Sequence, residues 1–299
     1  MSFLEISGRT DVGLQRTQNE DAIYFTPNVF EEVDIEMPDT STSDLNEGVP
    51  LLIVTDGMGG HADGGVAADL AIKGIRDSIR DQLISRPEQE IRQLLKKAQF
   101  QGHNDILEFL QKNPESVGMG TTSVVLLAMN DYLHISWVRD SRAYVLIQNK
   151  DASPKPFSFK LLSDDHSMVW EEVMKGNLTP EQARVSQLSN VITQSLGDIK
   201  SPPEPEYKKY PIDEKLLSVM LCSDGLNGMM PDDIIAATII KNRDQAPQLV
   251  AEALIEQAKR LGGNDNISVI IGFFDHDNAN VEIQKGSTSK APQSVDTIP

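Results

Sequence analysis

Short runs of β-branched and apolar residues recur along the chain and predict a series of β-strands. Several runs are separated only by brief polar gaps, such as Asn130-Asp131 and Asp140-Ser141. Gaps this short favour antiparallel meanders over a regular alternation of strands and crossover helices. The predicted strands span residues 3–7, 22–26, 51–55, 121–129, 132–138, 142–148, 157–162, 217–222 and 267–274.

Apolar residues recur at helical spacing in three longer segments, residues 65–84, 88–112 and 246–261. This spacing predicts amphipathic helices that each bury one face. Long helices combined with many hairpin-linked strands predict an α+β fold built in layers.

Two segments break this pattern. Residues 27–50 contain three prolines and no Lys or Arg, which predicts a long exposed acidic loop. After Phe274 the sequence is polar and aperiodic, so we expect a single domain over residues 1–274 and a flexible tail over residues 275–299. The acidic residues of the loop are Glu31, Glu32, Asp34, Glu36, Asp39, Asp44 and Glu47.

The composition is strongly acidic, with 27 Lys or Arg residues, 45 Asp or Glu residues and a formal net charge of −18. This charge argues against nucleic acid and anionic membranes as partners, because binding to phosphates depends mainly on Lys and Arg. A single cysteine excludes an intramolecular disulfide and a Cys-based zinc cluster. The sequence has no apolar run near the roughly 20 residues that span a bilayer and no signal-peptide pattern, so we expect a cytoplasmic protein.

The candidate functional residues are aspartates at the ends of predicted strands, several of them beside glycine. A carboxylate at the mouth of a buried strand is costly unless it is paired or bound to metal. Several carboxylates at one sheet end repel one another unless cations lie between them. An all-oxygen ligand set favours Mg²⁺ or Mn²⁺ over zinc. These residues are Asp21, Asp56, Asp140, Asp224 and Asp265.

The aspartates belong to ordered sequence motifs that resemble those of a known enzyme family. The chain resembles the metal-dependent protein serine/threonine phosphatases (the PPM, or protein phosphatase 2C, family) in their compact bacterial form. The resemblance covers about residues 6–273 and implies a four-layer αββα sandwich of two antiparallel sheets flanked by helix pairs. The motifs, in family order, are RTQNEDAIYF (16–25), LLIVTDGMGGHADGGVAA (51–68), GMGTTSVVLLA (118–128), WVRDSRAYVL (137–146), LLSDDHS (161–167), NVITQSLG (190–197), LCSDGLNGMM (221–230) and GGNDNISVII (262–271).

The resemblance implies a ligand set for two core metal ions, either Mn²⁺ or Mg²⁺. Asp21 and Asp56 match the core ligands, with Asp56 bridging the two ions and the Gly57 carbonyl assisting. Asp224 and Asp265 match the remaining ligands of the second ion.

Three further residues take roles from the same resemblance. Glu20 would act in the outer shell through water. Asp140 matches the ligand of a third, weaker metal ion that it shares with Asp224. Arg16 matches the residue that grips the substrate phosphate, a task that suits a planar and permanently charged guanidinium.

The activity that the resemblance implies is hydrolysis of phosphoserine and phosphothreonine in proteins. Water activated by two metal ions would attack phosphorus in line, so no protein nucleophile is needed and Cys222 is expected to be a buried strand residue. The expected partners are phosphorylated protein substrates and a cognate serine/threonine kinase, and the chain is expected to act as a monomer.

The chain departs from the family pattern at two positions. Arg139 stands where the family has glycine before Asp140, and its side chain either points away or competes with the third metal ion. Met58 stands where eukaryotic members have a histidine that protonates the leaving group. His61 is the nearest candidate for that acid, with an ordinary loop role as the alternative, whereas His166 is expected to orient the flap over residues 164–190 that covers the site.

Two other functions remain open from the sequence. One is a phosphoprotein-binding regulator that has lost its chemistry, against which the presence of all five aspartates argues. The other is a partner-switching phosphatase that acts on an anti-sigma-factor antagonist, a type that normally carries sensor domains. For the serine/threonine phosphatase itself, residues 164–190 and the acidic loop over residues 27–50 are expected to set the preference for substrates.

Overall fold

The structure is a computed structural model of the full chain. All structural statements below concern the described residues. These are residues 3–31, 39–59, 63–85, 90–149, 156–164, 176–179, 182 and 194–276.

One antiparallel sheet of six strands has the order β3-β1-β12-β11-β8-β9. Strand β12 lies at its centre and pairs with β1 on one side and β11 on the other. The strands span Phe3–Asp11 (β1), Ser41–Asp44 (β3), Arg142–Gln148 (β8), Phe157–Leu161 (β9), Leu216–Cys222 (β11) and Ile267–Asp275 (β12).

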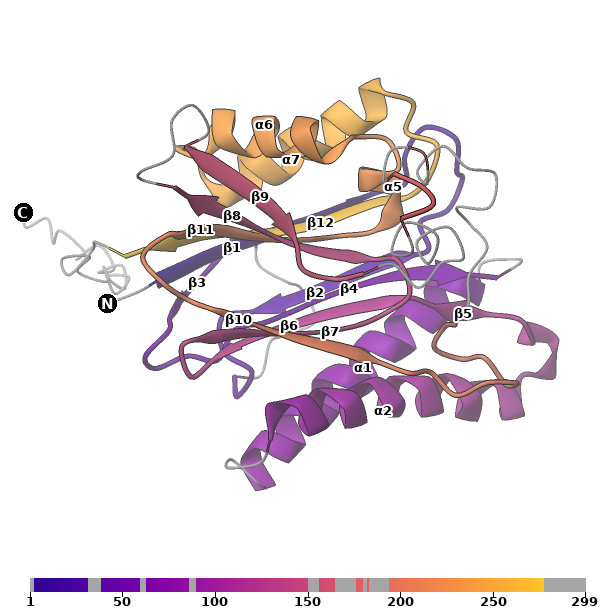
Figure 1. Ribbon diagram of the computed structural model, residues 1–299. Helices are drawn as coiled ribbons and strands as arrows, with labels where there is room; N and C mark the ends of the chain where they lie inside the picture. Colours follow the sequence, from indigo (N-terminus) through magenta and orange to yellow (C-terminus); the bar gives the residue numbers. More distant parts are fainter. Residues whose placement is uncertain are drawn as a thin grey trace, which may run out of the picture.

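A second antiparallel sheet has the order β10-β7-β6-β4-β2, and the short strand β5 pairs with the end of β4. Figure 1 shows the two sheets stacked face to face. The strands span Asp21–Thr26 (β2), Leu51–Met58 (β4), Gly120–Thr121 (β5), Ser123–Met129 (β6), Tyr132–Val138 (β7) and Glu206–Pro211 (β10).

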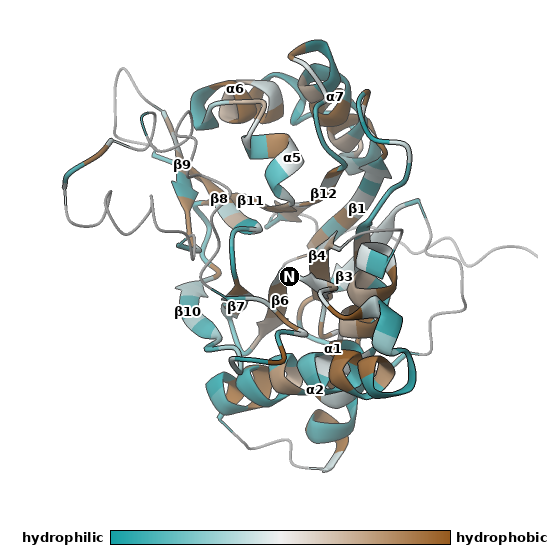
Figure 2. Cartoon of the chain, turned by 90° about the vertical axis from the view of Figure 1, so that its right-hand side faces the viewer, coloured by the Kyte–Doolittle hydropathy of each residue, from teal (hydrophilic) through white to brown (hydrophobic). Residues whose placement is uncertain are grey.

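Helices cover the outer face of each sheet, α1 and α2 on one side and α6 and α7 on the other (Figures 1 and 2). A single 3₁₀ turn, Pro114–Ser116, follows α2, and the one-turn helix α5 follows β11. The helices span Asp63–Ser85 (α1), Ile91–Lys112 (α2), Asp224–Asn227 (α5), Asp232–Asn242 (α6) and Pro247–Arg260 (α7).

Three apolar clusters fill the spaces between these four layers. Along β4, Ile53 packs toward α1 and α2, whereas its neighbours Leu52 and Val54 pack between the sheets. Along β11, Leu221 packs between the sheets and Met220 packs toward α6 and α7. Because both faces of each sheet are buried, the central strands read as continuous apolar runs. The structure therefore confirms the four-layer αββα sandwich.

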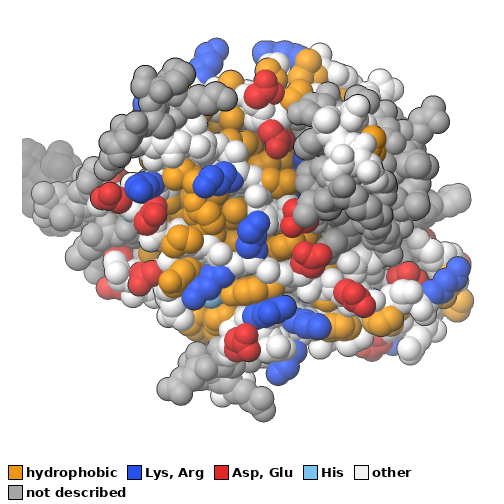
Figure 3. All heavy atoms as spheres, viewed as in Figure 1, with side chains coloured by type: hydrophobic (Ala, Val, Ile, Leu, Met, Phe, Trp, Pro, Cys, Tyr) orange, Lys and Arg blue, Asp and Glu red, His pale blue; other side chains and the backbone are white. Residues whose placement is uncertain are grey.

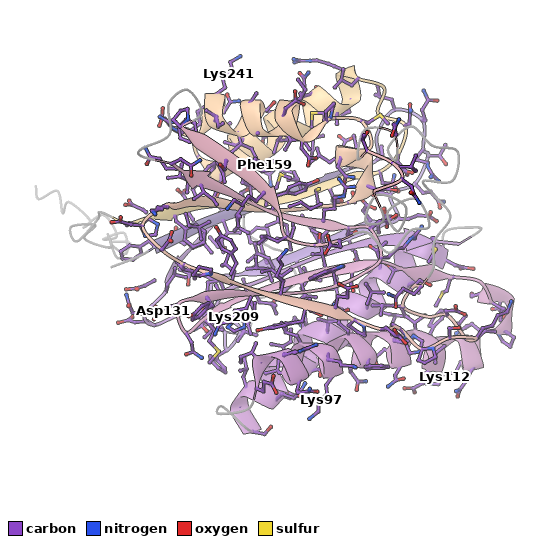
Figure 4. All side chains as sticks on the ribbon, in the orientation of Figure 1. Lys97, Lys112, Asp131, Phe159, Lys209 and Lys241 are labelled. Carbon is purple, nitrogen blue, oxygen red and sulfur yellow. The ribbon has the colours of Figure 1, made fainter. Side chains whose placement is uncertain are left out.

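The outer strands β9 and β10 contact the strands beside them through different side-chain interactions (Figure 4). Phe159 of β9 stacks on Tyr144 with 4.6 Å between the ring centroids. On β10, Lys209 places its Nζ 3.4 Å from the centroid of the Tyr132 ring. Figure 3 shows Lys and Arg side chains over the region where β10 crosses this face. Charge on an edge strand discourages pairing with another chain.

Most predicted elements are present, and the differences have physical causes. The predicted strand 121–129 is divided into β5 and β6 at Thr122, whose side chain bonds another strand. The acidic segment 27–50 is not loop throughout, because β3 pairs its backbone with β1. Strands β3 and β10 and helix α6 were not predicted, since β3 and β10 are polar edge strands and α6 has no clear apolar stripe.

Two predicted features fall largely outside the described residues. Of the flap over 164–190, only residues 164, 176–179 and 182 are described, and of the tail over 275–299 only Asp275 and His276. Among the helices that the structure describes, none is long and apolar enough to cross a membrane.

Helix α1 offers a matched test of the layered core. Ile79 is fully buried against the sheet, whereas Ile84, five residues later, is 65% exposed. We expect Ile79→Ala to lower the free energy of unfolding by about 2–5 kcal/mol, because it removes a buried side chain and leaves a cavity. Ile84→Ala should change it by less than about 0.5 kcal/mol. Urea unfolding of both variants measures the difference, and equal losses would contradict this packing.

Candidate active site

The strand beginnings and ends that carry the five candidate aspartates lie at one end of the sandwich, toward the side where Figure 1 labels β5 and α5. Asp21 begins β2, and Asp56 lies near the end of β4. Asp224 begins α5 directly after β11, while Asp140 and Asp265 precede β8 and β12. Because neighbouring strands are antiparallel, these strand beginnings and ends meet at the same end of the two sheets. We call the five residues the acidic cluster.

Asp21 and Asp56 form the centre of the acidic cluster. They are direct partners in the register of β2 and β4, a position at which neighbouring side chains lie about 4.5–5.5 Å apart at Cβ. Asp21 is 8% exposed, and its Oδ2 accepts a hydrogen bond of 2.7 Å from Ser223 Oγ. Two like charges placed directly opposite each other are destabilising unless something between them is positive.

Asn266 ties the loop between β1 and β2 to the start of β12. Its Oδ1 accepts a 2.8 Å hydrogen bond from the Glu20 amide, and its Nδ2 donates to the carbonyls of Val12 and Gln18 at 3.0 and 2.9 Å. The side chain is buried, so these bonds satisfy polar atoms that would otherwise be costly. The sequence reasoning missed Asn266, although its place directly after Asp265 in the motif GGNDN was a signal.

Two glycines allow the backbone at the site to pack closely. A Cβ on Gly225 would lie 1.9 Å from the Asn266 carbonyl oxygen, and one on Gly57 would lie 2.1 Å from the Gly64 carbonyl oxygen. No side chain fits at these distances. The glycines that follow Asp224 and Asp56 are therefore required by packing.

Hydroxyl groups fix the end of β4. The Asp56 amide donates to Thr122 Oγ1 at 2.8 Å, and Thr121 Oγ1 donates to the Asp56 carbonyl at 2.9 Å. Thr122 Oγ1 is in turn 2.7 Å from Ser141 Oγ, next to Asp140. The sequence reasoning assigned no role to these hydroxyls, since their partners come from distant strands.

Burial and like charge raise the pKa values of the central carboxylates. Burial raises the pKa of Asp21 to about 7, although hydrogen bonds from Ser223 and Ser268 oppose the rise. Asp56 keeps a partly exposed surface, but the surrounding protein raises the pKa of its carboxyl group well above the ordinary value, and Asp21 and Asp224 add to the rise. Cations placed among these groups would remove this penalty.

At the outer side of the cluster, Arg16 pairs with Asp265. Its Nη2 lies 2.7 Å from Asp265 Oδ2, and half of the Arg16 side-chain surface remains exposed. Glu20 lies nearby, and burial raises its pKa while Arg16 lowers it. The structure therefore brings the predicted phosphate-binding arginine to the acidic cluster, where it is bound to a predicted metal ligand.

Arg139 turns inward. Its side chain is 10% exposed, and its Nε lies 3.3 Å from Asp140 Oδ1. Its Nη1 is 3.1 Å from the Met58 sulfur. Of the two orientations that the sequence left open, the structure has the one that brings the guanidinium to Asp140.

The acidic cluster fits divalent metal ions in its chemistry. All its potential metal ligands are oxygens at one end of the sheets. The mutual repulsion of these carboxylates favours the binding of cations. In the described part of the chain, no three acidic, histidine or cysteine side chains converge tightly enough to enclose an ion as they stand. Oδ2 of Asp21 is bonded to Ser223 and Oδ2 of Asp265 to Arg16, so an ion that binds either of these oxygens would replace or share a protein partner.

Four further residues were singled out from the sequence, and the structure describes two of them. His61 and His166 lie outside the described residues. Met58 lines a cleft of about 410 Å³ that extends between Val117 and Ile199. Cys222 is fully buried in β11, as predicted.

Comparison with known proteins agrees with this geometry. A family model described as protein phosphatase 2C matches residues 30–267. The chain is 30% identical over 263 residues to the serine/threonine phosphatase stp of Listeria monocytogenes, covering 88% of this chain and 93% of that protein. It is 29% identical over 276 residues to the protein phosphatase PhpP of Streptococcus pneumoniae, covering 92% of this chain and 100% of that protein.

Solved structures show the same architecture. The serine/threonine phosphatase PstP/Ppp of Mycobacterium tuberculosis superposes with a TM-score of 0.70 at 29% identity, covering 91% of this chain and 98% of that one. The catalytic domain of PstP in complex with two manganese ions superposes with a TM-score of 0.68 at 27% identity, covering 92% and 99%. The chain therefore belongs to the protein phosphatase 2C family and is a metal-dependent protein serine/threonine phosphatase.

Proposed function

We propose that the acidic cluster binds two catalytic divalent cations. The observation that carries this proposal is the register pairing of Asp21 with Asp56, two carboxylates that burial keeps from ionising freely. Asp56 is the proposed bridging ligand, and Asp224 and Asp265 complete the set from the other sheet. The Gly57 carbonyl contributes beside Asp56, and Glu20 acts from the outer shell.

The proposed ions are Mn²⁺ or Mg²⁺. Carboxylate and carbonyl oxygens suit both, and the acidic cluster consists of aspartates. The related PstP catalytic domain, which was solved with two manganese ions, supports the number.

In the proposed reaction, the ions supply activation of water for attack on phosphorus and neutralisation of charge on the phosphate. The side chains of this chain position the substrate. Arg16 lies at the solvent side of the cluster and would bind phosphate oxygens with its guanidinium fork once it leaves Asp265. Cys222 is fully buried in β11 and takes no part.

We propose further that the enzyme works as a cytoplasmic monomer opposite a cognate serine/threonine kinase. A phosphatase of this kind needs a kinase to supply its substrates, and protein kinases draw on cytoplasmic ATP. Size-exclusion chromatography with light scattering tests the monomer, and comparison of phosphoproteins in cells with and without the enzyme identifies the substrates. The leaving-group role of His61 stays a prediction.

The metal proposal makes a testable prediction about chelation. EDTA should abolish hydrolysis of p-nitrophenyl phosphate and lower the melting temperature, because ions bound only by the folded state stabilise it. Added Mn²⁺ should restore both. Activity that survives exhaustive chelation would refute the assignment.

The chelated protein should also show a characteristic dependence on pH. Because the pKa of Asp21 is about 7 in the folded state and 3.8 ordinarily, the folded state binds more protons than the unfolded state between these values. Stability contributed by this group therefore falls as the pH rises through that window. Thermal melts from pH 5 to 8 measure the slope, and Asp21→Asn should flatten it.

A substitution at Asp56 is expected to have opposite effects on catalysis and on thermal stability. Asp56→Asn should lower kcat by about 10³-fold or more, since it removes a charge that metal binding needs. In chelating buffer the variant should melt at or above the wild-type temperature, because a buried repulsion is lost. Asp81→Asn is the control, as the Asp81 side chain is 72% exposed on α1. Full activity of Asp56→Asn would contradict the two-ion site.

The role of Arg16 is tested by two substitutions. Arg16→Ala should lower kcat/KM by about 10- to 100-fold, mainly through KM, because hydrogen bonds to charged groups contribute about 1.5–3 kcal/mol. Arg16→Lys should recover only part of the loss, since it keeps the charge without the fork. An unchanged kcat/KM in both variants would move the phosphate contact to another residue.

A further inference from the structure

Arg139 has an unusual backbone conformation. It lies in the turn between β7 and β8 with a φ of 84°. Residues with a Cβ rarely adopt this region, and when they do the surrounding structure holds them there. The side chain lies toward Asp140 and Met58.

The guanidinium of Arg139 is buried against Asp140. The whole residue is 9% exposed, as is Asp140, and Nε lies 3.3 Å from Asp140 Oδ1. On its other side, Nη1 reaches the Met58 sulfur at 3.1 Å. A charge taken out of water is retained only where opposite charge compensates it, and here Asp140 provides that charge.

The guanidinium of Arg139 offsets part of the negative charge at the Asp140 end of the acidic cluster. Burial raises the pKa values of both Asp140 and Asp56, and the guanidinium of Arg139, which contacts Asp140 directly, opposes that rise. Its permanent positive charge therefore stabilises two carboxylates at once, one by direct contact and one across the cluster.

We propose that the guanidinium of Arg139 is the permanent counter-charge of Asp140. Asp140 therefore forms an ion pair with Arg139 and does not bind an additional metal ion. The inference rests on the proposed two-ion site. A divalent ion bound to Asp140 would lie within a few ångströms of the guanidinium, in a buried setting where like charges repel strongly. Arg139 is thus a positioning residue, and metal binding stops at the core ions.

The number of Mn²⁺ ions bound per chain tests the proposal. Metal-free wild type, Arg139→Gly and Arg139→Lys are titrated with Mn²⁺ and the bound ion is counted by electron paramagnetic resonance. Glycine suits the positive φ and removes the charge, so Arg139→Gly should bind one ion more than wild type. Arg139→Lys keeps the charge and should bind the wild-type number.

Two further variants identify the site of the extra ion. Arg139→Asn also tolerates positive φ without charge, and it should gain the same ion if Arg139→Gly folds poorly. Arg139→Gly combined with Asp140→Asn should return to the wild-type number, because the proposed ligand is removed.

Equal numbers of bound ions in wild type, Arg139→Gly and Arg139→Asn would overturn the inference. If these variants also showed a raised KM for p-nitrophenyl phosphate, Arg139 would be a substrate contact. In both cases Mn²⁺-dependent activity of the wild type would leave the proposed function intact. A wild type that binds no Mn²⁺ and hydrolyses no phosphate ester would refute both proposals.

Discussion

Repulsion between carboxylates at one end of the sandwich is the constraint on which the rest of the site depends. Asp21 and Asp56 face each other in the β2–β4 register, and Asp224 approaches from the other sheet. Water relieves this repulsion less well than cations do, because the surrounding protein limits the solvation of these groups. The need for metal ions is therefore built into the strand pairing itself.

The layered core supplies the rigidity that this repulsion demands. Both sheets are buried on both faces, so the strands that carry the carboxylates cannot move apart without exposing apolar surface. Close to the site, neutral hydroxyl and amide groups replace apolar packing: Ser223 bonds Asp21, Thr122 bonds the Asp56 backbone, and Asn266 joins the β1–β2 loop to the start of β12. Such groups hold charged loops in place without adding charge.

The sequence predicted those parts of the molecule that depend on local pattern. Strands buried on both faces appear as apolar runs, and aspartates lie at their ends, two of them directly before glycine, so the central strands and the acidic cluster could be found. Strands β3 and β10 have polar sequences and exist through backbone pairing at sheet edges. Asn266 and Thr122 act on partners 246 and 66 residues away, and no local pattern encodes such distances.

The distribution of positive charge distinguishes the proposed core-ion site from the Asp140 end of the acidic cluster. Asp265 has the guanidinium of Arg16 at one end, and Asp140 has that of Arg139 at the other. At the centre, Asp21 has a hydroxyl as its partner and faces Asp56. The two arginines differ in exposure: the Arg16 side chain is 50% exposed and can move to a substrate, whereas that of Arg139 is 10% exposed and confined. Under the proposed roles, mobile charge lies where phosphate would bind, and fixed charge lies where the protein only has to balance its own carboxylates.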